Sequence, residues 1–213
     1  MCCVWFYSLV FQKLNADKYD AIFYNIYKNS NLVELNLPGN NLASVNPDLF
    51  GSAITKLRSA NLCDTRLSRT MIQNLLQKMC GDSHLRSLDL SHNLGFADIS
   101  PKLFSEAMIS LTSLNLKMNR ITYHQMYSLL SSMATSTSKL RDINFSGISS
   151  LARLEPEVVS GAMMCLRRVV MYACKLTQYQ LHKILVTLGT INLFLTSTFC
   201  YIRQFSPTVC NSP

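Results

Sequence analysis

Glycine and proline are scarce in this sequence, with 7 and 6 copies in 213 residues. Flexible linkers are rich in glycine, serine or proline, so the composition leaves no room for a long linker between domains. The one stretch dominated by serine and threonine, residues 131–138, has the length of a loop. We therefore expect a single domain.

Enzyme motifs are missing as well. The sequence has no Gly-x-x-x-x-Gly-Lys-Ser/Thr loop for nucleotide phosphates, no His-Glu-x-x-His zinc motif and no Gly-x-Ser-x-Gly nucleophile turn. Its 12 carboxylates are spread thinly along the chain. We predict no catalytic residue, no cofactor and no enzymatic activity.

The eight cysteines do not follow the spacing of a disulfide framework or a zinc site. No Cys-x-x-Cys pair occurs, and the four histidines stand apart from the cysteines. Scattered thiols of this kind are typical of a reducing compartment. We predict no metal site and a cytoplasmic location.

What the sequence does contain is a repeat with the spacing Leu-x-x-Leu-x-Leu-x-x-Asn-x-Leu. It is clearest at residues 32–42 and 111–121. The first apolar position of the seven copies falls at Val4, Leu32, Leu57, Leu85, Leu111, Leu140 and Leu166. Successive starts are therefore 25 to 29 residues apart, and long and short steps alternate. This period and pattern predict a short strand followed by a helix in each unit.

The segments between the strands predict two kinds of helix. In the longer units apolar residues recur on one helical face, and the N-cap candidates are Asn15, Ser68, Thr122 and Thr177. Two of these, Thr122 and Thr177, have a glutamine three residues later, as in a capping box. In the shorter units the helix is expected to begin at Pro47, Pro101 and Pro156. Asn46 and Ser100 precede two of these prolines as expected caps.

A unit of this length cannot bury its strand and its helix alone, so stacked units must share one core. We predict an α/β solenoid, a right-handed horseshoe of about seven repeats over residues 1–188, with parallel strands on the concave side and helices on the convex side. The first, fourth and sixth positions of each unit should lie in the core. The apolar start, residues 1–11, lacks the basic leader of a signal peptide and fits the register as the first strand.

Residues 189–213 form a divergent hydrophobic tail. The uncharged stretch 184–202 has 19 residues, which could just span a bilayer as a helix. Polar residues interrupt it, and its beginning belongs to the last repeat helix. We favour a hydrophobic cover on the end of the array or a non-native tail, and a membrane span remains an alternative.

With this register, the sequence resembles the ribonuclease-inhibitor-like class of leucine-rich repeat proteins over roughly residues 4–188. The stretches 39–50 and 88–93 are typical of animal arrays of that class. The resemblance implies a horseshoe that binds other proteins on its concave strands. The best-known members oppose an acidic inner face to basic ribonucleases. Because this chain has a formal charge of +8 and no acidic inner row, ribonuclease inhibition is not expected.

Positions 3, 5 and 7 of each strand should face the concave side, because side chains alternate along a strand. These positions are small and polar in the middle of the array and bulkier at its ends. Aromatic and arginine side chains often dominate protein interfaces. The predicted protein-binding residues are Asn36, Asn61, Asp89, Asn115, Lys117, Asn144, Arg168 and Tyr172. Alternatively, the asparagines simply tolerate a solvated sheet.

Basic residues form two rows. Position 10 of each long unit supplies a basic rim of Lys13, Arg66, Arg120 and Lys175. Position 2 supplies a second row of Arg58, Arg86, Arg141 and Arg167. Such rows could attract an acidic protein or a phosphate backbone, and ordinary solvation of charged residues is the alternative. No run of stacking aromatics and no nucleic-acid motif is present, so we expect no nucleic-acid partner.

These features predict a non-catalytic protein-binding scaffold or recognition module whose partner is another protein, with acidic proteins among the candidates. Two alternatives remain open. One is a regulatory array that acts on a GTPase or a ubiquitin ligase, with catalysis supplied by the partner. The other is a membrane-tethered array anchored by the apolar stretch near the C-terminus.

Overall fold

The computed structural model describes residues 5–12, 14–29, 31–134, 137–187 and 201–203. Its strands form one sheet in sequence order. They are β1 (Trp5–Ser8), β2 (Leu32–Asn36), β3 (Ser59–Asn61), β4 (Ser87–Asp89), β5 (Ser113–Asn115), β6 (Asp142–Asn144), β7 (Arg168–Val170) and β8 (Tyr201–Arg203). Strands β1 to β7 are parallel, and β8 pairs antiparallel with β7.

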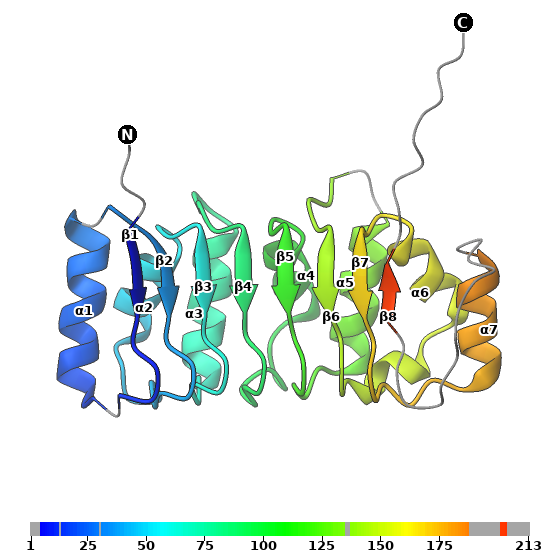
Figure 1. Ribbon diagram of the computed structural model, residues 1–213, viewed down its shortest axis with the longest axis horizontal. Coiled ribbons are helices and arrows are strands. Elements are labelled where there is room, and N and C mark those ends of the chain that lie inside the picture. The colour runs from blue at the N-terminus through cyan, green and yellow to red at the C-terminus, as the bar shows by residue number, and fades with distance from the viewer. Residues whose placement is uncertain (1–4, 13, 30, 135–136, 188–200, 204–213) are drawn as a thin grey trace, which may run out of the picture.

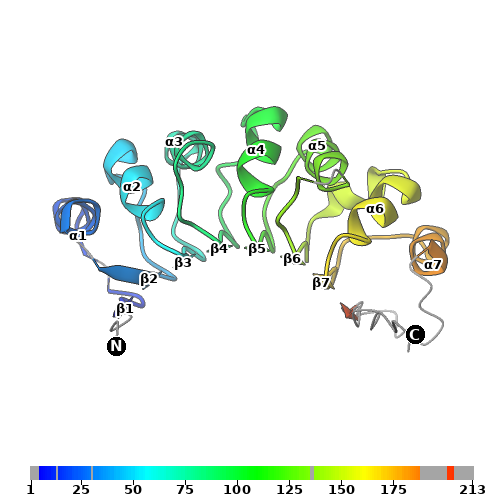
Figure 2. The same ribbon diagram turned by 90° about the horizontal axis from the view of Figure 1, so that it is seen from above.

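The helices alternate with the strands along the chain. They are α1 (Ala16–Asn29), α2 (Pro47–Ile54), α3 (Arg69–Met79), α4 (Pro101–Met108), α5 (Tyr123–Met133), α6 (Pro156–Met163) and α7 (Gln178–Thr187). Figure 1 shows the strands side by side in front of the helices, and Figure 2 shows the strands on the inner side and the helices on the outer side of a gentle arc. The predicted α/β solenoid is confirmed.

The fourth consensus position forms a continuous apolar spine. Its residues from β2 to β7 are directly paired in register and are at most 3% exposed. They are Leu35, Ala60, Leu88, Leu114, Ile143 and Val169. The spine explains why no unit is stable alone, since each of these side chains needs the units beside it for burial.

The first unit departs from this prediction. Tyr7 is paired in register with Leu35, yet its side chain is 44% exposed, and Leu9 is only partly buried. Among the described residues β1 has a neighbouring strand on one side only, so its side chains lack the cover that an inner strand receives from a second neighbour. The expectation that Tyr7 lies in the core was therefore wrong.

The helix lengths follow the alternation of the repeat. The long units carry helices of 14, 11, 11 and 10 residues, and the short units carry helices of 8 residues. Each short helix begins at the predicted proline. A difference of about three residues corresponds to nearly one helical turn.

Most predicted caps are confirmed. Asn46 accepts hydrogen bonds from two backbone N–H groups, Ser68 accepts one from Met71, and Thr122 forms a complete capping box with Gln125. Ser100 makes no side-chain capping bond, so that prediction was wrong. Pro101 follows it with a φ angle already suited to the first helical position, and the helix begins without that bond.

The consensus asparagine connects neighbouring units. Asn93 is fully buried, and its Nδ2 donates to the carbonyls of Leu62 at 2.8 Å and Leu90 at 3.1 Å. Its Oδ1 accepts from the N–H of Leu67 at 3.0 Å. In the last unit a thiol takes this place, since Cys174 Sγ donates to the carbonyl of Phe145 at 3.2 Å.

The backbone turns the same corner after every parallel strand. The eighth residue of each unit has a positive φ, between 51° and 77°. These residues are Phe11, Gly39, Asp64, His92, Met118, Gly147 and Ala173. Hydrogen bonds to the next unit hold the corner: for example, the N–H of His92 donates to the carbonyl of Lys117 at 2.9 Å. Because these bonds fix the backbone, the corner accepts residues other than glycine.

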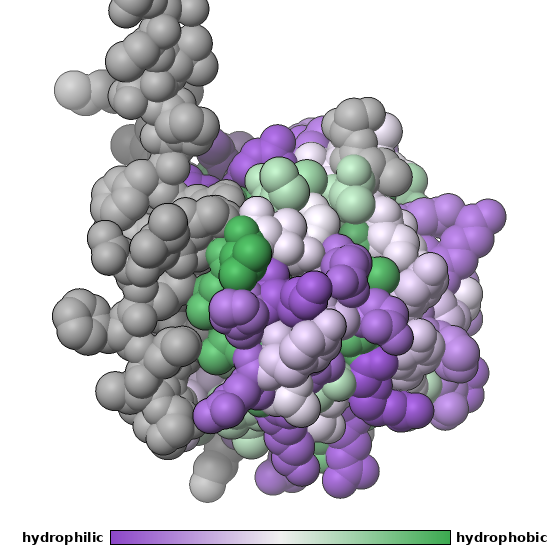
Figure 3. Space-filling view, turned by 90° about the vertical axis from the view of Figure 1, so that its right-hand side faces the viewer, coloured by the Kyte–Doolittle hydropathy of each residue, from purple (hydrophilic) through white to green (hydrophobic). Residues whose placement is uncertain are grey.

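Two elements were not predicted. A 3₁₀ helix, η1 (Ser149–Arg153), precedes α6, and β8 lies within the segment predicted as a tail. The stretch 184–202 falls partly outside the described residues. Within the described part of the chain, no helix is long and apolar enough to cross a membrane. Viewed from the α7 end, hydrophilic residues cover most of the coloured surface in Figure 3, with a small apolar group at one border.

Candidate functional site

The predicted polar row runs across the concave face. Its five central members occupy the same register position on β2 to β6, and all are partly buried. They are Asn36, Asn61, Asp89, Asn115 and Asn144. The sheet therefore brings together residues that are about 25 to 29 positions apart in the sequence.

The side-chain oxygens of this row bind the backbone at the ends of the strands. The Oδ1 atom of Asn61 accepts from the N–H of Cys63 at 3.1 Å, and that of Asp89 accepts from the N–H of Ser91 at 2.8 Å. Asn115 and Asn144 make the same bond to the residue two positions later, at 3.1 and 2.9 Å. The row therefore has a structural role, which sequence reasoning offered only as general tolerance of a solvated sheet.

The amide nitrogens of the row differ from one another. Asn115 Nδ2 donates to Asp89 Oδ2 at 2.8 Å, and Asn36 Nδ2 donates to Ser8 Oγ at 3.0 Å. Within the described residues, no such bond is made by the Nδ2 atoms of Asn61 and Asn144. These two amides are the hydrogen-bond donors that the row leaves available to a partner.

Lys117 is the exposed cation in the middle of the concave face. It occupies position 7 on the strand edge, between Ser91 and Ser146, which are only 2% and 3% exposed. The structure gives its ammonium group no ion pair with any described carboxylate. A long charged side chain between two small buried ones is well placed to contact a partner.

At the β7 end, Arg168 is less available than the sequence suggested. Asp142, 7% exposed, lies beneath two arginines: its Oδ2 is 3.0 Å from Arg167 Nη2, and its Oδ1 is 3.6 Å from Arg168 Nε. One of these arginines comes from the position-2 row and the other from the predicted concave-face residues, and both contact the same carboxylate. Tyr172, at the other end of the strand, is 41% exposed.

The basic rim at position 10 lies in the loops that follow the strands. Arg66, Arg120 and Lys175 are exposed there, and no described carboxylate forms an ion pair with them. Lys13 lies outside the described residues. Because the strands are parallel, the position-2 row lies where the strands begin and this rim lies beyond the ends of the strands, on the opposite side of the sheet.

A shallow pocket of about 790 Å³ lies at the other edge, where β2 to β5 begin. Sequence reasoning placed Arg58 and Arg86 in the position-2 row, and alternation along the strands put Glu34, Ser59, Ser87 and Ser113 on the concave side. It missed the pocket itself and assigned no role to Lys56 and His84. Each missed residue stands two positions before one of the arginines. This repeated spacing of two basic residues in neighbouring units is the sequence signal that could have predicted a basic cluster here.

Side chains with a displaced pKa belong to the helical side. A hydrogen bond from Lys78 holds the pKa of the Asp48 carboxyl below its usual value. Burial raises the pKa of Tyr19 and, with the nearby charge of Glu106, that of the Cys80 thiol. These shifts accompany packing between helices and place no reactive group on the concave face.

The described residues include no group of three or more His, Cys, Asp or Glu side chains placed to hold a metal ion. The four cysteines in this part of the chain, Cys63, Cys80, Cys165 and Cys174, are free thiols. The other four cysteines lie outside the described residues.

Comparison with known proteins agrees with the geometry. A family model described as Leucine Rich repeat matches residues 81–93 and 107–123, which contain β4 and β5 with the loops after them. The chain contains leucine-rich repeats. No curated protein matches the sequence. Leucine-rich repeats suggest a protein-binding scaffold, and they specify no partner.

Proposed function

We propose that this leucine-rich repeat array is a non-catalytic, cytoplasmic scaffold of the ribonuclease-inhibitor-like class that binds another protein on its concave face. One observation carries the proposal. The sheet is buried against the helices on one side, whereas its other side presents a row of partly buried polar side chains that crosses the five units from β2 to β6. A rigid surface of this kind suits a protein partner, because it offers extended contact without needing to rearrange.

The contacts are assigned to two parts of this face. In the centre, the amides of Asn61 and Asn144 have free donors and Lys117 supplies a charge. In the last unit, Tyr172 supplies an exposed aromatic side chain after β7, and the Arg168–Asp142 pair lies where β7 begins. Aromatic anchors surrounded by polar groups are the usual composition of an interface centre and its rim.

The test compares two charge-matched double variants. Lys117→Glu with Tyr172→Ala changes the concave face, whereas Lys18→Glu with Tyr24→Ala changes exposed positions on α1. Each purified protein is incubated with cell extract, cross-linked and analysed by quantitative mass spectrometry. We expect the amount of protein cross-linked to the concave variant to fall at least about tenfold, because the two substitutions remove two anchors of the interface.

The α1 variant should keep its partners, and both variants should keep the wild-type circular dichroism spectrum. Unchanged cross-links in the concave variant, or equal loss in both variants, would reject the concave face as the binding surface.

A further inference from the structure

We propose that the pocket where β2 to β5 begin is a second binding site, which takes an acidic peptide segment of a partner protein. The proposal rests on the protein-binding function above, but it concerns a different surface. The rim site is defined here by Lys56, Arg58, His84 and Arg86, with Glu34 at one end.

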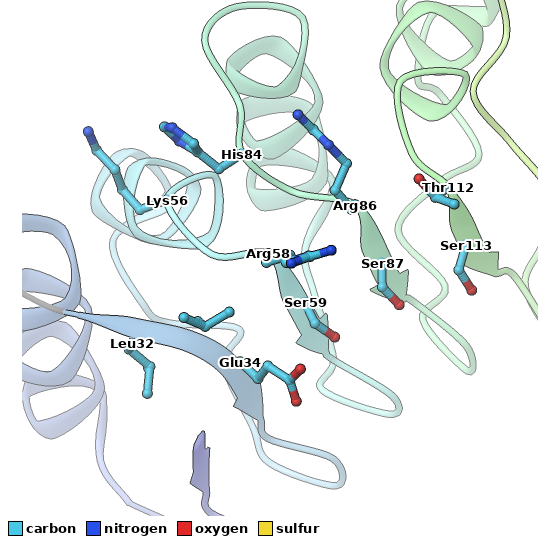
Figure 4. Close-up of a pocket in the computed structure, with 11 residues that line it drawn as sticks. Leu32, Glu34, Lys56, Arg58, Ser59, His84, Arg86, Ser87, Thr112 and Ser113 are labelled. Atoms are coloured by element: carbon cyan, nitrogen blue, oxygen red, sulfur yellow. The ribbon is translucent and has the colours of Figure 1, made fainter. Parts of the chain in front are cut away.

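Backbone hydrogen bonds bring the basic residues of two units together. The N–H of Arg86 donates to the carbonyl of Arg58 at 2.9 Å, and the N–H of His84 donates to the carbonyl of Thr55 at 2.9 Å. Figure 4 shows Lys56, His84 and Arg86 extending to the same side, while Arg58 lies across from β3 toward β4. The stacking of units therefore builds a cluster that no single unit contains.

One member of the cluster is already held in place. Arg86 is partly buried, and its Nη1 donates to the carbonyls of Leu85 at 2.7 Å and Ser83 at 3.2 Å. A side chain fixed in this way loses little conformational entropy when it binds an anion. Its remaining guanidinium donors stay available for a carboxylate.

The charges of the rim site are not neutralised from within the described chain. None of the four basic side chains forms an ion pair with a described carboxylate, although Glu34 lines the same pocket. Further along the same row, Arg167 is paired with Asp142 at 3.0 Å. Arg141, in the sixth unit, also forms no ion pair with a described carboxylate, but Thr112 occupies the row position between it and Arg86. The third and fourth units are thus the two adjacent units of the row whose arginines both lack an ion pair with a described carboxylate, and they bring these two charges together in the rim site.

The size and lining of the pocket favour an extended peptide. It crosses four strands, so it is about 14 Å long, which matches roughly four residues of extended chain. Ser59, Ser87 and Ser113 point to the concave side of the pocket and can donate hydrogen bonds to the main chain of a peptide. His84 is the one ring among the lining residues, so the pocket offers no series of aromatic side chains on which successive nucleic-acid bases could stack.

The experiment measures binding of a fluorescein-labelled tetraglutamate peptide to the full chain by fluorescence anisotropy, with tetraglutamine as the neutral probe. The test variant is Arg58→Glu with Arg86→Glu. Its matched control is Arg66→Glu with Arg120→Glu, which makes the same change in net charge on the opposite rim. A third variant, Glu34→Gln, removes the negative charge from the rim site.

We expect the wild type to prefer tetraglutamate, and the R58E/R86E variant to bind it at least about tenfold more weakly. The R66E/R120E control should stay within about twofold of the wild type. Its substituted charges lie beyond the opposite ends of the strands, and salt largely screens their effect on a peptide bound at the rim site. The E34Q variant should bind more tightly. A gain and a loss from neighbouring substitutions cannot both arise from misfolding.

Three outcomes would overturn the proposal: no preference for tetraglutamate in the wild type, equal weakening in both double variants, or tighter binding of a single-stranded oligonucleotide that R58E/R86E abolishes. The concave variant from the cross-linking test should still bind tetraglutamate. Unchanged cross-links in the concave variant, together with tetraglutamate binding that R58E/R86E weakens and R66E/R120E does not, would refute only the concave-face proposal. Loss of cross-links in the concave variant, together with no preference of the wild type for tetraglutamate, would refute only the rim site.

Discussion

Buried amide side chains join the repeats at the level of single residues. Gln125 is fully buried, and its Nε2 donates to the carbonyls of Phe96 at 2.7 Å and Ile99 at 2.8 Å in the preceding unit. Its Oε1 accepts from the N–H of Thr122 at 2.9 Å. One side chain thus caps its own helix and supplies the hydrogen-bond donor for two backbone carbonyls in a loop more than 25 residues earlier.

Replacing Gln125 should therefore be costly. We expect Gln125→Ala to lower the free energy of unfolding by about 2–3 kcal/mol, because two buried carbonyls lose their donor. Urea denaturation followed by circular dichroism measures the change. Gln77→Ala, at an exposed position on α3, serves as the control and should change stability by no more than about 0.5 kcal/mol. Equal effects at the two positions would contradict the assigned role.

The sequence predicted only half of what Gln125 does. Its capping-box spacing from Thr122 is local and could be recognised without a structure. Its bonds to Phe96 and Ile99 depend on the stacking of two units. The same limit applies to Arg168: its place on the strand followed from alternation, whereas its pairing with Asp142 depends on a side-chain conformation that no spacing encodes.

At the level of elements, neighbouring helices are joined by packing and by one notable ion pair. Lys78 on α3 lies with its Nζ 2.8 Å from Asp48 Oδ1 on α2. Asp48 also stands in the first turn of its helix, where the helix dipole favours a negative charge. The hydrogen bond from Lys78 is the main reason why the pKa of Asp48 lies below its usual value.

This pair should give stability a weak dependence on acid. Because the folded-state pKa of Asp48 is lowered, its contribution is complete above the usual carboxyl value of 3.8 and is lost as the pH falls through the lower folded value. We expect Asp48→Asn to be less stable than the wild type at pH 6 and equal to it once the Asp48 carboxyl of the wild type is protonated in both the folded and the unfolded state. Urea denaturation across this pH range measures the difference.

A difference that persists unchanged at the lowest pH would show that Asp48 acts through something other than its charge. Asp82→Asn, at an exposed position after α3, is the control, and it should show no comparable pH dependence.

Elements with a repeated signal could be predicted, and those without one could not. Pro47, Pro101 and Pro156 indicated three helix starts because they recur in register. The five residues of η1 are too few to show a periodic pattern. Strand β8 has three residues, and its antiparallel pairing with β7 joins segments about 33 positions apart, which local patterning does not report.

The whole molecule behaves as a row of coupled units rather than as a globule. Each described strand bonds only to the strands beside it, and the apolar spine passes through every unit from β2 to β7. Stability in such an array is close to a sum of unit terms and interface terms. A defect in the middle should therefore weaken the units on both sides of it.

We expect Leu114→Ala, in the spine at β5, to lower the free energy of unfolding by about 2–5 kcal/mol. Hydrogen exchange should show the largest loss of protection in β4, β5 and β6 and a smaller loss in α1. Leu94→Ala is the matched control, because Leu94 is 59% exposed and the same atoms are removed at little cost. A uniform loss of protection along the chain would favour a single cooperative core instead.

The corner that follows each strand also affects how the sequence can vary. Seven residues of six different types, from glycine to phenylalanine, share one backbone conformation there. At six of these positions, from Phe11 to Gly147, the backbone N–H donates to a carbonyl of the next unit, and four of the six residues are not glycine. A Cβ at Gly39 or Gly147 would collide with the side chain of Phe11 or Met118, so the identity of these two residues still matters. The array can therefore carry different side chains at most of its corners without a change in the backbone, and these corners are regularly spaced along the solenoid.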